Sequence, residues 1–319
     1  MRVESTTNPP TRIQTSKMGR SRKGRDVNGI LLLDKPSGLT SNRALQRAKG
    51  MMFARKAGHT GSLDPLASGL LPLCFGHATK VSAYLLEAHK TYEVTALFGA
   101  RTDTGDADGE VVEESDHVPS FTDINEVLPS FLGPQQQIPP MYSALKQDGK
   151  RLYKLAREGK VVERPPRDIT LYELTPLESA PGTMALRVKC SKGTYIRTLV
   201  EDIAEKLGAL SHVGILRRIG AGPFDQSQMV TLDQLEERIE NDGKEAADEW
   251  LLPLDTALTD WPSVELDSDT GFYLLNGQPV QAPGAPLEGS VRIYVDELGL
   301  VGLGEMLPDG RVAPRKLFR

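Results

Sequence analysis

Apolar side chains repeat with two different periods along this chain, and segments of the two kinds follow one another in no regular order. Residues 91–98 alternate between apolar and polar side chains, which is the pattern of a strand that buries one face. Residues 194–207 repeat apolar side chains every three to four positions and end at Gly208, which is the pattern of an amphipathic helix. Because strands and helices do not alternate as they would in a doubly wound sheet, the sequence predicts an α+β fold.

The same patterns place the remaining elements. Short apolar or alternating runs predict strands at residues 28–34, 167–176, 183–190 and 210–222. Amphipathic or capped stretches predict helices at residues 41–52, 78–87, 122–132, 150–159 and 231–240. Residues 101–109 are polar and glycine-containing, and they predict a turn.

Three stretches of different composition predict the domain organisation. Residues 1–26 show no apolar period and predict a flexible basic arm. Residues 27–251 hold the elements described above and predict one larger domain. From residue 252 to residue 319 the chain is rich in Gly and Pro with short apolar runs, which predicts a small appended β-rich domain.

The distribution of charge leaves a nucleic-acid partner open although the net charge is −5. Residues 17–25 hold five basic side chains, whereas residues 233–249 hold eight acidic and two basic ones. Much of the acidity can therefore lie on one surface helix away from any site. A basic arm beside a body of mixed charge is compatible with phosphate binding, and a solvated tail explains the arm equally well.

Several classes of protein are excluded by what the sequence lacks. It has no run of 18 apolar residues and no apolar signal segment at its start, which argues against a membrane or secreted protein. Its two cysteines, Cys74 and Cys190, form no zinc or disulfide pattern, so we expect a reduced, cytoplasmic location. P-loop, zinc-protease and serine-hydrolase motifs are absent and the five histidines lack metal spacing, so we expect neither a metal nor a cofactor.

One acidic residue, Asp64, stands alone in residues 58–69 among small residues and turn formers. An enzyme can present a single reactive carboxylate to a large substrate on such a loop. Asp followed by Pro is also ordinary turn chemistry, because Asp favours the first turn position and Pro the second. The loop alone therefore does not decide between a catalytic and a structural role.

The start of the helix at residue 194 supplies a candidate partner for this carboxylate. Arg197 lies in the first helical turn, where the helix dipole disfavours a cation, so it needs an anionic neighbour. Glu201, four residues on, is the local candidate and the one that the residue pattern favours. Asp64 is the alternative, across a cleft.

Three further side chains are candidates, and each has an ordinary structural explanation. Tyr195 lies beside the apolar stripe of the helix, so its hydroxyl can reach a site, or its ring can simply fill the core. Tyr92 stands near the end of a strand, where an aromatic ring can stack on a base or close a core. His59 precedes Asp64 by five residues and is alone more often structural than catalytic.

Five stretches carry recognisable motifs in a fixed order, among them Gly-Ile-Leu-Leu-Leu-Asp-Lys-Pro and Pro-Met-Tyr-Ser-Ala-Leu-Lys. They lie at residues 29–41, 58–72, 90–108, 140–146 and 191–199. In these stretches the chain resembles the TruB family of tRNA pseudouridine synthases. The resemblance starts at residue 27 and is densest in the first two-thirds of the chain. Residues 252–319 resemble, more loosely, the small PUA-like RNA-binding domain of bacterial members.

The resemblance implies a mixed, largely antiparallel sheet with flanking helices and a central RNA-binding cleft, plus the small β domain. It also implies a reaction, the isomerisation of uridine to pseudouridine at position 55 in the T loop of tRNA, without a cofactor. Asp64 matches the family's nucleophile and Arg197 the arginine that pairs with it, which reverses the preference for Glu201. Tyr195 matches the active-site tyrosine, a candidate for proton transfer.

The resemblance assigns the remaining positions to the substrate. Tyr92 matches the tyrosine that stacks on the flipped base, and His59 matches the histidine that fills the space which the base vacates. Leu216 matches a residue of the substrate pocket. Lys35, with Pro36, matches a motif that shapes the floor of the cleft, where Lys35 either touches phosphate or forms a structural salt bridge.

The leading hypothesis is therefore a monomeric tRNA-modifying isomerase that binds the T stem-loop and needs no protein partner. An RNA-binding protein or tRNA-folding chaperone is the alternative from another class, and both roles can coexist in one protein. A third possibility is the same chemistry at sites selected by a guide RNA. The short C-terminal domain and the lack of a long basic tail argue for the stand-alone enzyme.

Overall fold

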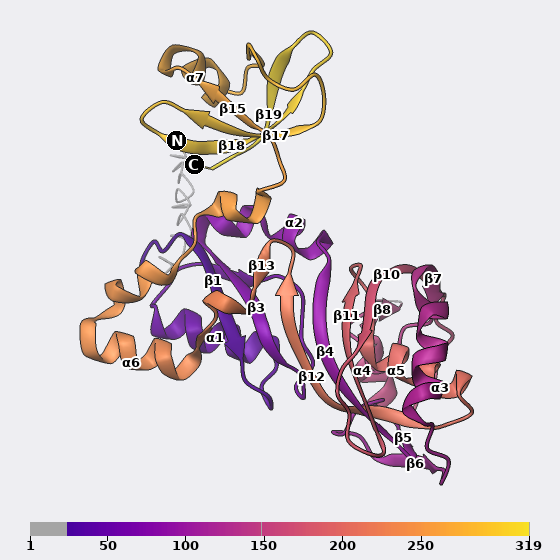
Figure 1. Cartoon of the computed structure of the whole chain (residues 1–319). Helices are drawn as coiled ribbons and strands as arrows, with labels where there is room; N and C mark the ends of the chain where they lie inside the picture. The colour runs from indigo at the N-terminus through magenta and orange to yellow at the C-terminus, as the bar shows by residue number, and fades with distance from the viewer. Residues whose placement is uncertain (1–23, 148, 319) are drawn as a thin grey trace, which may run out of the picture.

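The computed structural model describes residues 24–147 and 149–318, which form two main sheets (Figure 1). The larger sheet has the strand order β14-β1-β3-β12-β4-β11-β10-β7, with β2 added beside β3 and β13 beside β12. Its pairs are antiparallel except for β1 with β14 and β12 with β3. The predicted α+β fold with a mixed, largely antiparallel sheet is confirmed.

The strands of the larger sheet are β1 Gly29–Lys35, β2 Ala57–His59, β3 Ser68–Phe75, β4 Lys90–Phe98, β7 Gly133–Gln137, β10 Arg167–Pro176, β11 Thr183–Cys190, β12 Ser211–Ala221, β13 Phe224–Asp225 and β14 Val230–Thr231. Two short hairpins are formed by β5 Ala100–Thr102 with β6 Val111–Glu114 and by β8 Lys146–Gln147 with β9 Lys150–Arg151. The second main sheet holds β15 Ser263–Leu266, β16 Val280–Gln281, β17 Ser290–Val295, β18 Gly299–Met306 and β19 Arg311–Leu317.

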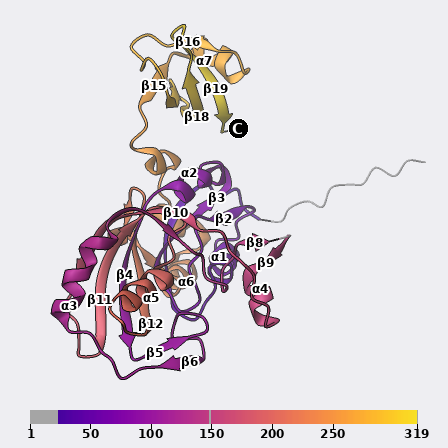
Figure 2. The same cartoon turned by 90° about the vertical axis from the view of Figure 1, so that its right-hand side faces the viewer.

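The helices are α1 Ser41–Met51, α2 Ser82–Glu87, α3 Phe121–Val127, α4 Leu152–Arg157, α5 Ile196–Lys206, α6 Leu232–Asp242 and α7 Ser268–Leu275. No helix in the described ranges is long and apolar enough to cross a membrane. Figure 2 shows the second sheet standing beyond one end of the first, connected to it by the single segment that follows α6.

The larger sheet is buried on both faces at β1, and the sequence of this strand shows how. Leu31 and Leu33 pack into the cluster beneath α1, α5 and α6, whereas Ile30 and Leu32 pack into the opposite cluster beneath α2. A strand that is covered on both faces needs consecutive apolar residues, which explains the unbroken run in β1. The alternation in β4 buries only Val94 and Ala96 fully, and it leaves Tyr92 partly open at the site end of the strand.

Some predicted helices are shorter than the apolar pattern indicated. The helix predicted at 78–87 is a 3₁₀ turn, Gly76–Lys80, followed by α2, because Thr79 and Ser82 donate their hydroxyls to backbone carbonyls. The helix predicted at 122–132 ends its α-helical part at Val127. Pro129 lacks the amide hydrogen that the next helical bond requires.

Two other predictions also differ in detail. Residues 150–159 begin as strand β9 before α4, and the polar turn at 101–109 is flanked by the β5–β6 hairpin. Most of the predicted arm, residues 1–23, lies outside the described residues. Arg25 forms ion pairs with Glu245 at 3.2 Å and Asp248 at 2.5 Å, so the end of the basic stretch contacts the acidic stretch.

Candidate active site

A cavity of about 320 Å³ opens where β3, β4 and β12 meet the start of α5. Its lining includes five of the seven site residues that the sequence predicted, namely Asp64, Tyr92, Tyr195, Arg197 and Leu216. These residues come from four separate segments of the chain. The sheet unites them because β12 pairs antiparallel with β4 and, through Arg217 and Arg218, parallel with the start of β3.

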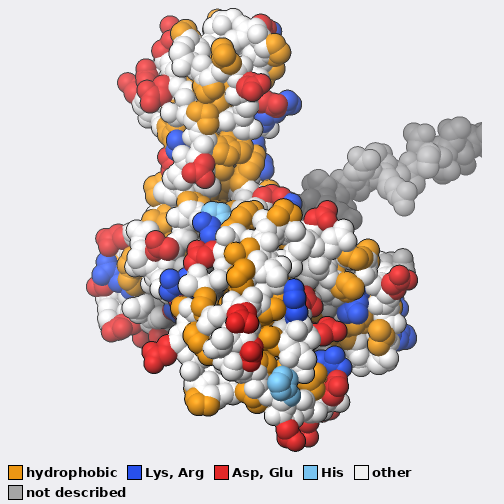
Figure 3. Space-filling model, turned by 45° about the vertical axis from the view of Figure 1, so that its right-hand side comes forward, with side chains coloured by type: hydrophobic (Ala, Val, Ile, Leu, Met, Phe, Trp, Pro, Cys, Tyr) orange, Lys and Arg blue, Asp and Glu red, His pale blue; other side chains and the backbone are white. Residues whose placement is uncertain are grey.

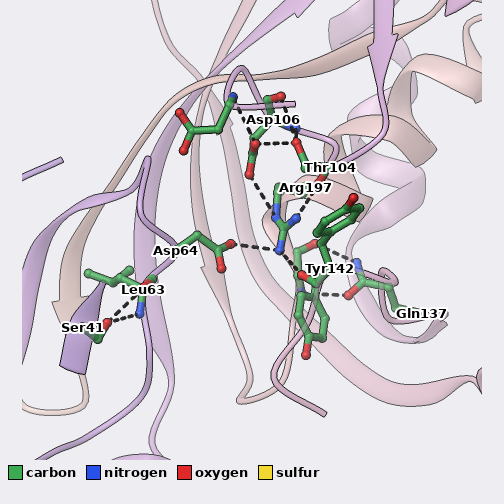
Figure 4. A network of polar contacts seen from close by, with 10 residues as sticks. Ser41, Leu63, Asp64, Thr104, Asp106, Gln137, Tyr142 and Arg197 are labelled. Atoms are coloured by element: carbon green, nitrogen blue, oxygen red, sulfur yellow. Dashed lines mark hydrogen bonds and ion pairs between the residues drawn. The ribbon is translucent and has the colours of Figure 1, made fainter. Parts of the chain in front are cut away.

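The loop that carries Asp64 is fixed on both sides of the carboxylate, and Figure 4 shows the contacts on the Leu63 side. Before it, the hydroxyl of Ser41 accepts the Leu63 amide hydrogen at 2.7 Å and donates to the Leu63 carbonyl at 3.0 Å. After it, the Pro65 carbonyl accepts from the Gly38 amide at 2.8 Å. These contacts hold the backbone on either side of Asp64. Its side chain remains 44% exposed, and the carboxylate faces the cavity.

Arg197 is the counter-ion of Asp64, with Nη2 at 3.0 Å from Oδ2 (Figure 4). Its guanidinium also lies 3.7 Å from Asp106 and donates to the backbone carbonyls of Thr104 and Tyr142. The side chain of Arg197 is only 5% exposed, and all of these partners hold it in place. Within the described ranges Glu201, the local candidate, forms no ion pair with Arg197.

Asp106 is a member of the site that the sequence did not single out. It is buried, and its carboxylate accepts hydrogen bonds from the Thr104 hydroxyl at 2.6 Å and from the Asp108 amide at 3.2 Å. Residues 101–109 read as a plain polar turn, and nothing in that pattern distinguishes Asp106 from its acidic neighbours. Only the folded chain shows that this turn packs under Arg197.

The ionisation of the site reflects burial opposed by charge. Burial raises the pKa of Asp64, the Arg197 guanidinium counters part of that rise, and the Asp106 carboxylate adds to it. Burial likewise raises the pKa of Tyr195, so its phenol stays protonated near neutral pH. The site therefore combines a paired carboxylate with a neutral hydroxyl.

The two tyrosines are positioned by the backbone around them. Tyr195 precedes α5, and Gln137 bonds it twice, accepting from its amide at 2.8 Å and donating to its carbonyl at 3.1 Å. Tyr92 pairs with Arg218 across β4 and β12, so both side chains point to the same face of the sheet. Leu216, two residues before Arg218 on β12, also lines the cavity.

Two predicted site residues do not line the cavity. Lys35 is fully buried, and its ammonium donates to the carbonyls of Pro36, Leu39 and Pro65, so it contacts neither solvent nor a carboxylate. In this structure Lys35 tethers the loop that carries Asp64, in place of the phosphate contact or salt bridge expected. His59 lies at the end of β2, and burial lowers its pKa, which favours the neutral ring.

The sequence analysis also did not single out a basic segment that follows the cavity wall in the chain. Residues 146–167 hold eight basic and three acidic side chains, and one residue separates them from Ser143 and Ala144 of the cavity wall. Residues 263–318, by contrast, hold eight acidic and four basic side chains. Figure 3 shows acidic groups spread over the lobe of the second sheet. Counting charges in windows along the whole chain would have revealed the difference.

Comparison with solved structures gives the class to which this fold belongs. A chain of a structure titled "Crystal Structure of a Cbf5-Nop10-Gar1 Complex" superposes with a TM-score of 0.71 at 27% identity, over 91% of this chain and 85% of that one. A chain of an H/ACA RNP structure, bound to a substrate RNA containing 2′-deoxyuridine, superposes with a TM-score of 0.69 at 25% identity. The fold is therefore a pseudouridine-synthase fold.

The sequence comparisons define the family. The N-terminal domain model of TruB family pseudouridylate synthases matches residues 49–196, and two TruB C-terminal models match residues 197–259 and 262–318. The tRNA pseudouridine synthase B of Pseudomonas fluorescens Pf-5 is 55% identical over 92% of this chain and 97% of its own length. That of Pseudomonas aeruginosa UCBPP-PA14 is 51% identical over the same shares. The chain belongs to the TruB family of pseudouridylate synthases.

Glu201 offers a test of the electrostatics around the site. Burial raises its pKa to about 7 from 4.5, so between these pH values the folded state holds more protons than the unfolded state. Stability attributable to this group therefore falls as pH rises from 4.5 to 7. Glu201→Gln removes this penalty. We therefore expect its effect on the free energy of unfolding to be about 1–3 kcal/mol more stabilising at pH 8 than at pH 4.5, since one pKa unit is about 1.4 kcal/mol.

Urea unfolding at the two pH values measures this difference. Glu240→Gln, on the exposed face of α6, is the matched control and should shift stability equally at both pH values. An identical effect of Glu201→Gln at pH 4.5 and pH 8 would show that Glu201 carries no burial penalty.

Proposed function

We propose that this protein isomerises uridine to pseudouridine in tRNA, at position 55 of the T loop. The observation that carries the proposal is the Asp64 carboxylate, paired with Arg197 at 3.0 Å, at the wall of a cavity of base-binding size. Family membership and the names of the curated relatives support the same reaction. The relatives are matched over 97% of their length, which supports a stand-alone enzyme that needs no protein partner. We expect it in the cytoplasm, because its two cysteines form no disulfide pattern.

The geometry suggests a separate role in the reaction for each of these residues. The target uridine must leave its stack to reach the cavity, at a cost of a few kcal/mol, and stacking on Tyr92 repays part of that cost. Asp64 then adds covalently to the nucleotide, and the fixed Arg197 keeps the carboxylate ionised and oriented. Tyr195, protonated and inside the cavity, is positioned to hold or pass a proton.

The rest of the RNA has to lie outside the cavity. The distribution of basic residues indicates which surface of the protein contacts its phosphates. The basic residues of 146–167 come shortly after Ser143 and Ala144 of the cavity wall in the chain, whereas the second sheet is net acidic. Since phosphate contacts dominate RNA affinity, we assign most of them to the segment that holds β8, β9 and α4.

This assignment predicts how binding depends on salt. Lys150→Ala with Lys154→Ala should weaken T-arm binding and reduce the slope of log K against log salt by about 1.4–1.8, if each lysine contacts one phosphate. Titrations between about 50 and 200 mM salt measure the slope. Arg47→Ala with Arg238→Ala removes the same charge near the acidic helix α6, where both side chains already pair with carboxylates. Equal slopes for the two double variants would count against the assigned surface.

The reaction itself is tested by mapping pseudouridine in a tRNA transcript after incubation with the purified protein. We expect one modified position, in the T loop, and no modification when that uridine is replaced by cytidine. Modification elsewhere would overturn the proposed position, and no modification in either transcript would overturn the proposed activity.

A further inference from the structure

Arg218 lies in the wall of the cavity and is 1% exposed. Its Nε donates to the Leu70 carbonyl at 2.7 Å and its Nη2 to the Gly61 carbonyl at 3.2 Å. No carboxylate of the described residues lies within 4.0 Å of it. Its neighbour Arg217 differs, because it forms a bidentate pair with Asp34 at 2.7 and 3.0 Å.

Such a charge is costly to bury. Removing a guanidinium from water costs several kcal/mol, and an ion pair normally offsets that cost. The two carbonyls and the side chain of Tyr92 satisfy some of its donors, but these neutral partners leave the charge itself uncompensated. The positive charge of Arg218 also contributes to the lowered pKa values of Lys35, Lys90 and His59, although burial is the larger cause for each. The charge of Arg218 therefore acts on the titratable groups around it, and anchoring of the loop at Gly61 does not by itself require a charged side chain.

The position of Arg218 shows which part of a bound nucleotide it would meet. Tyr92, the proposed stacking ring, is its direct partner across the two strands. Among the described residues Arg218 forms no ion pair with Asp64, and Arg197 is already held by Asp64, Asp106 and two carbonyls. Of the two arginines that line the cavity, only Arg218 is therefore on the side of the base and without an anion.

Resting on the proposed function, we propose that Arg218 is a catalytic residue that stabilises the negative charge on the detached uracil. When the C1′–N1 bond breaks, its electron pair stays with the base and spreads over N1, O2 and O4, while Asp64 compensates the electron-deficient sugar. The base turns, C5 forms the new bond to C1′, the proton on C5 leaves, and N1 gains a proton. No oxidant or reductant is required.

A fixed donor aimed at developing charge is typically worth a factor of about 10²–10³ in rate. We therefore expect Arg218→Gln to slow single-turnover cleavage of the N-glycosidic bond of uridine about 100-fold, with RNA affinity within about twofold. A 5-fluorouracil anion holds its charge with less help, because fluorine withdraws electrons. With 5-fluorouridine at the target position, the penalty should fall to about 10-fold, scored as loss of the nucleoside after nuclease digestion.

Arg218→Lys keeps the positive charge but displaces it. Its rate penalty should therefore also be larger with uridine than with 5-fluorouridine, by a smaller factor than for Arg218→Gln. This variant tests the proposal if Arg218→Gln does not fold. Arg217→Gln, outside the cavity, is the matched control and should affect both bases by the same factor. Equal penalties on the two bases for both Arg218 variants would show that Arg218 only anchors the Gly61 loop. A wild-type protein that leaves both nucleosides intact would refute the proposed function instead.

Discussion

Asp64→Asn is expected to lower pseudouridine formation by about 10⁴-fold or more, a loss typical of removing a covalent nucleophile. The substitution replaces one oxygen by an amide nitrogen of similar size, so the loop held by Ser41, Gly38 and Lys35 should keep its shape. An amide cannot add to the nucleotide as a carboxylate does. Single-turnover assays on a T-stem-loop RNA measure the rate.

The same variant should bind the RNA with an affinity within about twofold of wild type, because the proposed phosphate contacts lie in residues 146–167. Asp233→Asn, at the start of the acidic helix α6, is the control and should retain full activity. Turnover by Asp64→Asn within tenfold of wild type would rule out the nucleophile. Retained promotion of tRNA folding by the inactive variant would show the chaperone role as a separate activity.

Arg197→Met is expected to have the second largest effect. It leaves the carboxylates of Asp64 and Asp106 without their shared cation, in a site where Arg197 is almost fully buried. Removing one member of a buried ion pair costs about 3–5 kcal/mol of stability. The pKa of Asp64, already raised by burial, should rise further because the guanidinium that opposes the rise is gone.

Activity depends on ionised Asp64, so it is lost as pH falls through the pKa of that group. The acid limb of the rate profile of Arg197→Met should therefore lie at higher pH than in wild type, with a rate loss of about 10²-fold at neutral pH. Adding Asp106→Asn removes one unpaired carboxylate and should restore part of the stability, a coupling that a double-mutant cycle reveals. An unmoved acid limb and strictly additive stabilities would contradict the network.

The fold was predictable where local pattern and burial agree. The strand at 91–98 and the helix at 194–207 agree with β4 and α5 to within two residues at each end, because each buries one regular face. The lengths of the helices near Thr79 and Pro129 were overestimated. There a side-chain hydroxyl or a missing amide hydrogen interrupts the backbone hydrogen bonds of the helix without changing the apolar period.

The site was only partly predictable, since its contacts join distant segments. Arg197 has a plausible partner four residues away in Glu201, and residue pattern alone favoured that pair. Only the packing of the Asp64 loop against α5 shows which carboxylate it meets. Asp106 lies in a turn whose composition is that of any surface turn. Arg218 was visible as a charge in an apolar strand, but its lack of a counter-ion is a property of the folded chain.

The most direct test of the central claim is tritium release from a tRNA transcript that contains [5-³H]uridine. Moving the sugar bond from N1 to C5 expels the hydrogen on C5, so each turnover releases one tritium. We expect wild-type protein to release one tritium per transcript, Asp64→Asn to release none on the same time scale, and a transcript without the T-loop uridine to retain its label. Release from that altered transcript, or equal release by Asp64→Asn, would contradict the account.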